Sequence, residues 1–353
     1  MLWIDWPDKV LRTLRKGVVI PASPLALDER RGFDARRQRA LARYYMDAGS
    51  GGIAIGVHTT QFEIRDVSLF EPVLETVARE MDSWSDKPLL RIAGLVGKTE
   101  QARREAHIAR AMGYHAGLLN LAAYRGASED DIIDHCRAVA SEFPLIGFYM
   151  QTAVGGIVLS AGFWRRFAEI ENVVAIKMAP FNRYQTLDVM RGVVDAEAED
   201  RISMYTGNDD HIVMDLVTPF TFARRGEMVT MRIVGGLLGH WSVWTKSAVQ
   251  LLARCQTAAG SGSIDNNLLA LDSQVTDCNA ALFDVVNGFA GCISGVHEVL
   301  RAQGLLAGTW CLNPDETLSD GQQAELDRVR AIYPHLIDDD FVAENLERWL
   351  ATD

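Results

Sequence analysis

The chain has 353 residues, of which 48% are hydrophobic and 23% charged, as is usual for a globular protein. Its formal net charge of −12 argues against binding of nucleic acid or of an anionic membrane surface. The sequence has no apolar run of 18 residues and no apolar core at its N-terminus, so neither a transmembrane helix nor a signal peptide is expected. Five scattered cysteines without a Cys-x-x-Cys pair predict neither a zinc ribbon nor a disulfide framework, and a cytoplasmic location follows.

Short apolar segments typical of buried strands recur along the first two thirds of the chain, each followed by a segment with helical periodicity. From the fourth strand onward the starts lie 27 to 29 residues apart, the size of one strand–helix unit. The predicted helices include 34–48, 99–112 and 128–141. The predicted strands are 17–22, 52–57, 89–95, 116–121, 145–150, 173–178, 202–206 and, least clearly, 229–234.

Eight such units over about 240 residues predict a (β/α)₈ barrel. A doubly wound open sheet is the alternative, but its Gly-rich phosphate turn is missing after the first strand, which continues VVIPASPLALDE. We therefore expect an N-terminal helical extension at 1–16, a catalytic barrel at 17–258 and a C-terminal helical region at 259–353.

The C-terminal region follows a flexible Gly-Ser segment at 260–263 and shows no strand pattern. One long helix is expected at 273–303, with a break near Gly288 or Gly291. Ser319 and Gln322 stand at capping-box spacing before another helix, and a last helix is expected at 340–351. The apolar segments of the C-terminal region predict that this region packs on the barrel or on a partner subunit.

Lys177 stands at the end of the apolar run NVVAIKMA. A lysine at the end of a buried strand has a lowered pKa, and its neutral amine is a nucleophile that forms Schiff bases with carbonyl compounds. The alternative is a lysine whose amine reaches solvent or pairs with a carboxylate.

The other candidate residues also stand at predicted strand ends, where barrel enzymes carry their active sites. A tyrosine such as Tyr149 is suited to moving protons during imine formation. The simpler alternatives are packed tyrosines, turn threonines, and helix caps for the acidic residues, whose metal-ligand spacing is poor. A cluster of His240, Trp241 and Trp244 fits a core or an interface as well as a pocket. The candidates are His58, Thr59, Thr60, Tyr124, Tyr149, Lys177, Gly207, Asn208, Asp209, Asp210 and His211.

These residues resemble the motifs of the dihydrodipicolinate synthase/N-acetylneuraminate lyase family of Schiff-base aldolases. The resemblance covers nearly the whole chain and includes the separation of 28 positions from Tyr149 to Lys177. The segments that carry it are IPASPLALDE, His58-Thr59-Thr60-Gln61-Phe62, Ala122-Ala123-Tyr124, Tyr149, Lys177 and Thr206-Gly207-Asn208-Asp209.

The resemblance implies that Lys177 forms an imine with a 2-oxo acid such as pyruvate. It further implies that Tyr149 is the proton shuttle, Thr59 a relay hydroxyl and Tyr124 a relay that reaches a neighbouring subunit. Thr60 and the amides of its turn would hold the substrate carboxylate, beside the substrate-binding positions His58 and Gly207. A homo-oligomer, either a dimer or a tetramer, and no cofactor or metal are expected.

The departures from the family pattern are equally specific. His58 and Gln61 replace turn glycines and crowd the approach of a carboxylate, and the synthase's second carboxylate-binding arginine falls at Val154. We therefore expect a lyase, aldolase or dehydratase that is not the lysine-pathway synthase. One alternative is a homologue that binds an oxo acid without turnover. Another is a phosphate-binding barrel isomerase using the Gly-rich segment 235–239, the one candidate for its phosphate turn.

Overall fold

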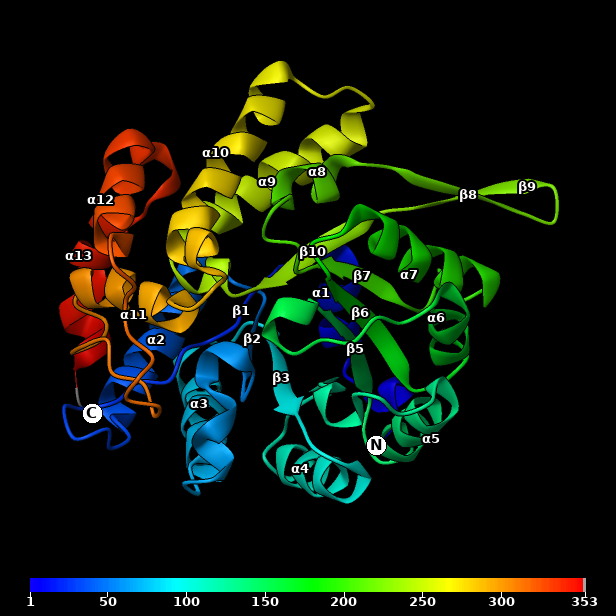
Figure 1. Cartoon of the computed structure of the whole chain (residues 1–353), viewed down its shortest axis with the longest axis horizontal. Coiled ribbons are helices and arrows are strands. Elements are labelled where there is room, and N and C mark those ends of the chain that lie inside the picture. The colour runs from blue at the N-terminus through cyan, green and yellow to red at the C-terminus, as the bar shows by residue number, and fades with distance from the viewer. Residues whose placement is uncertain (352–353) are drawn as a thin grey trace.

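The computed structural model describes residues 1–351 and confirms the predicted (β/α)₈ barrel with a C-terminal helical part (Figure 1). Eight parallel strands follow one another in the order β1-β10-β7-β6-β5-β4-β3-β2. A parallel bridge between Ala22 and Ala54 joins β1 to β2 and brings the two ends of the sheet together. The strands are β1 Val19–Pro21, β2 Gly52–Ile55, β3 Leu90–Leu95, β4 Ala116–Leu119, β5 Leu145–Met150, β6 Val173–Ala179, β7 Ser203–Thr206 and β10 Ile233–Leu238.

Helices surround the strands because each carries one apolar face toward the sheet. The capping box of Ser128 and Asp131 starts α5 as predicted. The helices of the barrel are α2 Ala35–Ala48, α3 Phe70–Trp84, α4 Thr99–Ala111, α5 Glu129–Ala140, α6 Ala161–Ala168, α7 Arg183–Asp195, α8 Ile212–Val217 and α9 Thr245–Ser261. Short 3₁₀ turns are η1 Trp3–Asp5, η2 His58–Thr60, η3 Phe62–Arg65, η4 Ala122–Tyr124, η5 Thr152–Val154, η6 His240–Ser242, η7 Val285–Asn287 and η8 Pro334–Leu336.

The amino end of the barrel is closed by the N-terminal helix α1, Asp8–Lys16. Val10 and Leu14 of α1 pack with side chains that point into the barrel, such as Ile92 and Tyr205. The Tyr205 hydroxyl donates a hydrogen bond of 2.8 Å to the Leu14 carbonyl. The barrel interior is therefore sealed at this end by residues that precede its first strand.

The strand predicted at 229–234 is wrong in its boundaries. The structure has an antiparallel hairpin, β8 Phe220–Arg224 and β9 Glu227–Met231, and only then the last barrel strand β10. Arg225 and Gly226 join the hairpin with φ of 52° and 85°, the positive pair that a tight type I′ turn needs. The hairpin extends away from the barrel (Figure 1). The predicted segment therefore ran across the boundary between two separate strands.

The C-terminal part consists of α10 Asn266–Leu282, α11 Cys292–Ala302, α12 Gln322–Ile332 and α13 Asp339–Leu350. The long helix predicted at 273–303 is interrupted, as expected near Gly288 and Gly291. Asp284, Gly288 and Phe289 have φ of 56°, 64° and 72° there, which ends helical geometry. These helices pack beside the barrel helices α2 and α8 (Figure 1).

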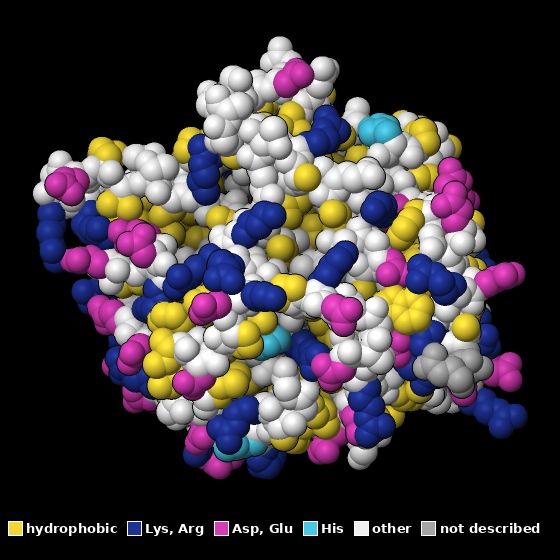
Figure 2. All heavy atoms as spheres, turned by 180° about the vertical axis from the view of Figure 1, so that it is seen from behind, with side chains coloured by type: hydrophobic (Ala, Val, Ile, Leu, Met, Phe, Trp, Pro, Cys, Tyr) yellow, Lys and Arg dark blue, Asp and Glu magenta, His cyan; other side chains and the backbone are white. Residues whose placement is uncertain are grey.

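The surface carries charges of both signs. On the face turned away from the view of Figure 1, Lys and Arg side chains alternate with Asp and Glu and with small hydrophobic patches (Figure 2). Within residues 1–351, no helix is both long enough and apolar enough to cross a bilayer.

Candidate active site

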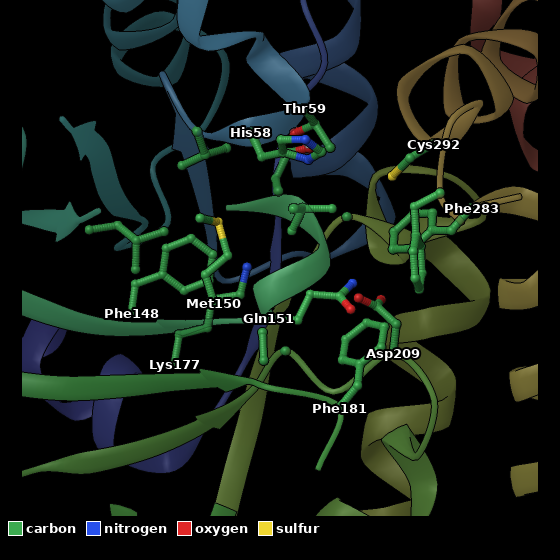
Figure 3. Close-up of a pocket in the computed structure, with 18 residues that line it drawn as sticks. His58, Thr59, Phe148, Met150, Gln151, Lys177, Phe181, Asp209, Phe283 and Cys292 are labelled. Carbon is green, nitrogen blue, oxygen red and sulfur yellow. The ribbon is translucent and has the colours of Figure 1, made fainter. Parts of the chain in front are cut away.

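A cavity opens at the carboxyl ends of the barrel strands, where its walls come from the barrel and from the break between α10 and α11 (Figure 3). Its volume of about 70 Å³ admits several water-sized groups, since one water takes about 10–15 Å³ on the same measure. Most of the lining side chains are apolar, and the polar side chains among them include His58, Thr59, Gln151, Lys177 and Asp209. A small ligand held mainly by apolar contact fits such a site.

Lys177 lines the cavity from β6, all seven residues of which are buried. Its Nζ lies 4.4 Å from the centroid of the Phe148 ring, which belongs to the paired position of β5. Burial lowers the pKa of Lys177 to about 8, although the neighbouring Asp209 acts to raise that pKa. Roughly a quarter of such amines are neutral at pH 7.5, against about one in a thousand for an ordinary lysine.

Gly207 is the residue that makes room for this lysine. A Cβ at position 207 would lie 2.5 Å from Lys177 Cε and 3.1 Å from its Cγ, so the lysine would have to move to admit any side chain there. The Gly207 N–H donates to the Met178 carbonyl at 2.6 Å, which holds the loop against β6. The predicted site residue Gly207 thus lies on the cavity wall, directly against Lys177.

The loop after β7 is fixed by a buried hydrogen-bond network around Asp215 of α8. The Asp215 carboxylate accepts hydrogen bonds from the Thr206 hydroxyl at 2.6 Å and from the Asn208 amide at 2.9 Å. Asn208 also donates to the Thr186 hydroxyl and accepts from the Phe181 N–H. With its neighbours turned outward to this network, Asp209 is the residue of the loop whose side chain points into the cavity (Figure 3).

The simpler interpretation, that Asp209, Asp210 and His211 cap the helix after strand seven, is not supported: the N-cap residue of α8 is His211, and its side chain makes no capping hydrogen bond. A backbone N–H in the first turn of α8 is instead bonded from another helix: the Asp272 carboxylate of α10 accepts a hydrogen bond from the Met214 N–H at 3.1 Å. Asp209 is 5% exposed, and its Oδ1 has no hydrogen-bond partner. Burial raises the pKa of Asp209 to about 7, while Lys177 acts to lower it.

Tyr149 does not lie where its predicted role requires. Along β5, Phe148 and Met150 point into the barrel, so Tyr149 points outward and packs on Trp164 of α6. Its hydroxyl accepts a hydrogen bond from the Leu159 N–H at 3.2 Å. Tyr149 is absent from the lining of the Lys177 cavity, and Phe148 occupies the inward position opposite the lysine. The geometry therefore contradicts Tyr149 as the proton shuttle.

The turn after β2 brings His58 and Thr59 to the cavity. The Thr59 hydroxyl donates to the Ala22 carbonyl at 2.6 Å, and burial lowers the pKa of His58 to about 4, so its ring is neutral. Thr60 is fully buried behind them, donates to the Ser23 carbonyl and accepts from the Gly56 N–H. Gln61 turns away from the cavity and accepts from the Leu312 N–H at 2.6 Å. Of the two residues that replace the family's turn glycines, His58 and Gln61, only His58 lines the cavity and narrows it.

Tyr124 lies outside the cavity. Its hydroxyl is 2.8 Å from the Thr99 hydroxyl, its ring stacks on His135 at 4.4 Å, and Lys98 Nζ lies 4.0 Å from its ring centroid. Its predicted relay role involves a neighbouring subunit and stays a prediction.

Two other sequence features belong to the core. Trp241 and Trp244 are buried and pack between the barrel and α9, while His240 is 3.4 Å from the Asn279 amide. Gly235 and Gly236 lie inside β10, where a Cβ would meet Val18 at 2.6 Å or the Trp241 ring at 2.5 Å. These glycines serve close packing within the strand, so the phosphate turn of a barrel isomerase is not formed by them.

Sequence reasoning missed the inward direction of Phe148, Gln151 and Asp209. The alternation of β5 was the available signal for Phe148, because successive side chains of a strand face opposite sides. Nothing in the sequence marked Gln151. In the described part of the chain, no three His, Cys, Asp or Glu side chains are grouped as a metal site would require.

The fold and the cavity define a (β/α)₈-barrel protein that carries a buried lysine from its sixth strand. The sequence pattern of the Dihydrodipicolinate synthetase family matches residues 16–331, and the chain belongs to this family. The relatives that it resembles are lyases and synthases, so the chain belongs to a family of enzymes and has an aldolase-type fold.

Similarity to individual proteins is distant but extends over most of the chain. N-acetylneuraminate lyase 2 of Escherichia coli O6:H1 is 21% identical over 84% of this chain and 87% of its own length. The 4-hydroxy-tetrahydrodipicolinate synthase of Desulforudis audaxviator is 27% identical over 70% of this chain and 81% of its own length. The structure of a chloride-inhibited dihydrodipicolinate synthase from Acinetobacter baumannii complexed with pyruvate superposes with a TM-score of 0.72 at 18% identity, covering 89% of this chain and 98% of that one.

Proposed function

We propose that this protein is a lysine-dependent aldolase, lyase or hydro-lyase that binds pyruvate or another 2-oxo acid as an imine on Lys177. The observation that carries the proposal is a lysine amine buried at the wall of a small cavity, with a pKa lowered to about 8. Family membership and the pyruvate bound to the Acinetobacter baumannii synthase support the same substrate class.

The chemistry follows from the neutral amine. The Lys177 nitrogen attacks the keto carbon, the C=O π electrons move to oxygen, and one amine proton passes to that oxygen to give the carbinolamine. A second proton, taken from solvent or from a neighbouring acid, lets the oxygen leave as water. The resulting iminium withdraws electrons from the neighbouring carbon, which eases cleavage of a C–C or C–H bond there. Burial of the amine at this mostly apolar wall keeps bulk water away from it and so favours its uncharged form.

The second substrate, or the leaving fragment, is proposed to lack a second carboxylate. Val154 lines the cavity at the position where the lysine-pathway synthase carries an arginine, and no arginine is among the lining residues within 1–351. Without a cation to meet it, a second carboxylate would lose its hydration uncompensated. We therefore propose an activity other than that synthase.

The remaining site residues are proposed to act as the family resemblance implies. Thr59 and His58 border the cavity and would contact the substrate, with Gly207 beside the imine. The Thr60 side chain is engaged in holding the turn, and the Thr60 and Gln61 N–H groups donate to the Val57 and His58 carbonyls. The carboxylate would therefore meet other backbone N–H groups of the turn rather than the Thr60 hydroxyl. We also propose a dimer or tetramer, which light scattering of the purified chain would establish.

The test of this proposal is reductive trapping. Pyruvate and related 2-oxo acids are added with borohydride, and the modified residue is located by mass spectrometry. We expect one adduct on Lys177 in the wild type and none in Lys177→Ala. The matched control is Lys87→Ala, which removes an exposed lysine and should leave the adduct unchanged. Equal labelling of Lys177→Ala, or no adduct with any 2-oxo acid, would contradict the proposal.

A second candidate is a homologue that binds a 2-oxo acid without turnover. The observation that favours it is the phenylalanine at position 148, together with the outward direction of Tyr149, which leaves the cavity without a phenol. Stabilisation by pyruvate in a thermal-shift assay without retro-aldol or dehydration activity would support this candidate. Measurable turnover would exclude it.

A further inference from the structure

An imine on Lys177 is useful only if a neighbouring group moves protons, because an enamine forms by loss of a proton from the carbon beside the iminium. The titratable side chains that line the cavity are His58, Lys177, Asp209 and Cys292. The lining contains no tyrosine in the described part of the chain, since Phe148 takes the inward position. The proton acceptor must therefore be sought among groups other than a phenol.

Two of these groups are poor acceptors. The Cys292 thiol is buried, and burial raises its pKa far above neutral, so it holds its proton. Burial lowers the pKa of His58 to about 4, and a base that weak accepts a proton inefficiently. Lys177 itself is consumed by the imine. Asp209 is the group that remains.

Asp209 has the geometry of a reacting group rather than of a structural one. It is 5% exposed and its Oδ1 makes no hydrogen bond, although a buried polar atom is normally satisfied. Its neighbours Thr206 and Asn208 supply the bonds that hold the loop, so its carboxylate is not needed there. Figure 3 shows Asp209 and Gln151 pointing toward each other across the cavity, with Lys177 on the adjoining wall.

The charges that face Asp209 make it a proton carrier near neutral pH. Burial, and to a lesser extent the exposed neighbour Asp210, raises the pKa of Asp209 to about 7, while Lys177 and a hydrogen bond from the His240 backbone act to lower it. A group with such a pKa gives and takes protons at comparable rates under physiological conditions. When the imine forms, the iminium keeps a positive charge at the Lys177 nitrogen and so continues to favour the carboxylate.

We propose that Asp209 is the catalytic residue that carries protons to and from the substrate carbon in this site, in the place of a tyrosine. The inference rests on the proposed imine at Lys177. The Asp209 carboxylate removes a proton from the carbon beside the iminium, the C–H electrons form a C=C bond, and the C=N electrons move to nitrogen. The same carboxylic acid returns the proton when the enamine reverts, so the step needs no further reactant.

The experiment separates imine formation from proton transfer. Exchange of the pyruvate methyl protons in D₂O is followed by NMR, and borohydride trapping is measured on the same samples. We expect Asp209→Asn to keep the trapped adduct on Lys177 while its exchange rate falls at least about 100-fold, the usual contribution of a general base. Asp209→Glu, which restores a carboxylate, should recover part of the exchange.

Two control variants remove a carboxylate or a phenol that does not line the cavity. Asp86→Asn neutralises an exposed carboxylate that does not line the cavity, and Tyr149→Phe removes the outward phenol; both variants should exchange protons as the wild type does. Wild-type exchange in Asp209→Asn would overturn the inference. So would loss of trapping together with exchange, because Asp209 would then act before the enamine. If the wild type itself is not trapped, the proposed function fails first.

Discussion

At the scale of single residues, the direction of each side chain decides what the site can do. Phe148 and Tyr149 are neighbours in sequence, yet one faces Lys177 and the other packs on Trp164. A strand alternates its faces, so a shift of one residue exchanges the inward and outward sets. The sequence placed Lys177 correctly at the cavity. It predicted Tyr149 rather than Phe148 beside the lysine, because the spacing from Tyr149 to Lys177 matches the family while the alternation of β5 turns Tyr149 outward.

Gly207 provides a prediction at this scale. Gly207→Ala adds a methyl group that would overlap Lys177 Cε, so the lysine must move from its present position. A displacement of about 1 Å at a reacting atom commonly costs about 100-fold in rate, and we expect that loss in the trapping of pyruvate.

The matched control is Gly260→Ala, near the end of α9, where a new Cβ has no atom within 4 Å. It should trap pyruvate at the wild-type rate and melt no lower than the wild type. Trapping by Gly207→Ala at the wild-type rate would show that Lys177 does not depend on this glycine.

At the scale of elements, the sequence predicted the strands and helices of regular length and failed where a connection held structure of its own. The run 229–234 reads as one strand because Val229 to Val234 is largely apolar, yet its two halves belong to β9 and β10. The Arg225-Gly226 turn was the local signal of a hairpin. The capping prediction for the loop after β7 failed for another reason. The bonds that hold this loop and the start of α8 come from Asp215 of α8 and Asp272 of α10, which lie outside the loop, and they leave the Asp209 side chain to the cavity.

Contacts between elements give a second prediction. The Tyr44 hydroxyl of α2 donates to the Asp338 carboxylate at 2.7 Å and accepts from the Thr245 N–H at the start of α9, also at 2.7 Å. Tyr44→Phe leaves both buried partners without this bond, which should lower the free energy of unfolding by about 1–3 kcal/mol. Denaturant titration measures the change.

The control is Tyr184→Phe at a tyrosine that is 82% exposed, which should leave the free energy of unfolding unchanged. Because Tyr44 is remote from the cavity lining, Tyr44→Phe should keep its imine adduct under native conditions. Equal stability of the two variants would mean that the Tyr44 hydroxyl does not hold α2, α9 and the segment before α13 together.

At the scale of the whole molecule, the lysine is shielded because both ends of the barrel are covered. The helix α1 fills the amino end with Val10 and Leu14. At the carboxyl end, Phe283, Phe289 and Cys292 from the break between α10 and α11 form part of the cavity wall. The barrel and its terminal helices were predictable from periodicity, whereas this covering was not, because it joins segments more than 100 residues apart in the chain.

Imine formation requires Lys177 to be uncharged often enough to react, and the pH dependence of trapping measures this directly. The amine loses its proton as the pH rises, so the initial rate of cyanoborohydride trapping with pyruvate should rise and level off around a midpoint of about 8. A free lysine derivative measured in parallel should keep its ordinary midpoint above 10. A midpoint above 10 for the Lys177 adduct would contradict a shielded, reactive amine in this barrel.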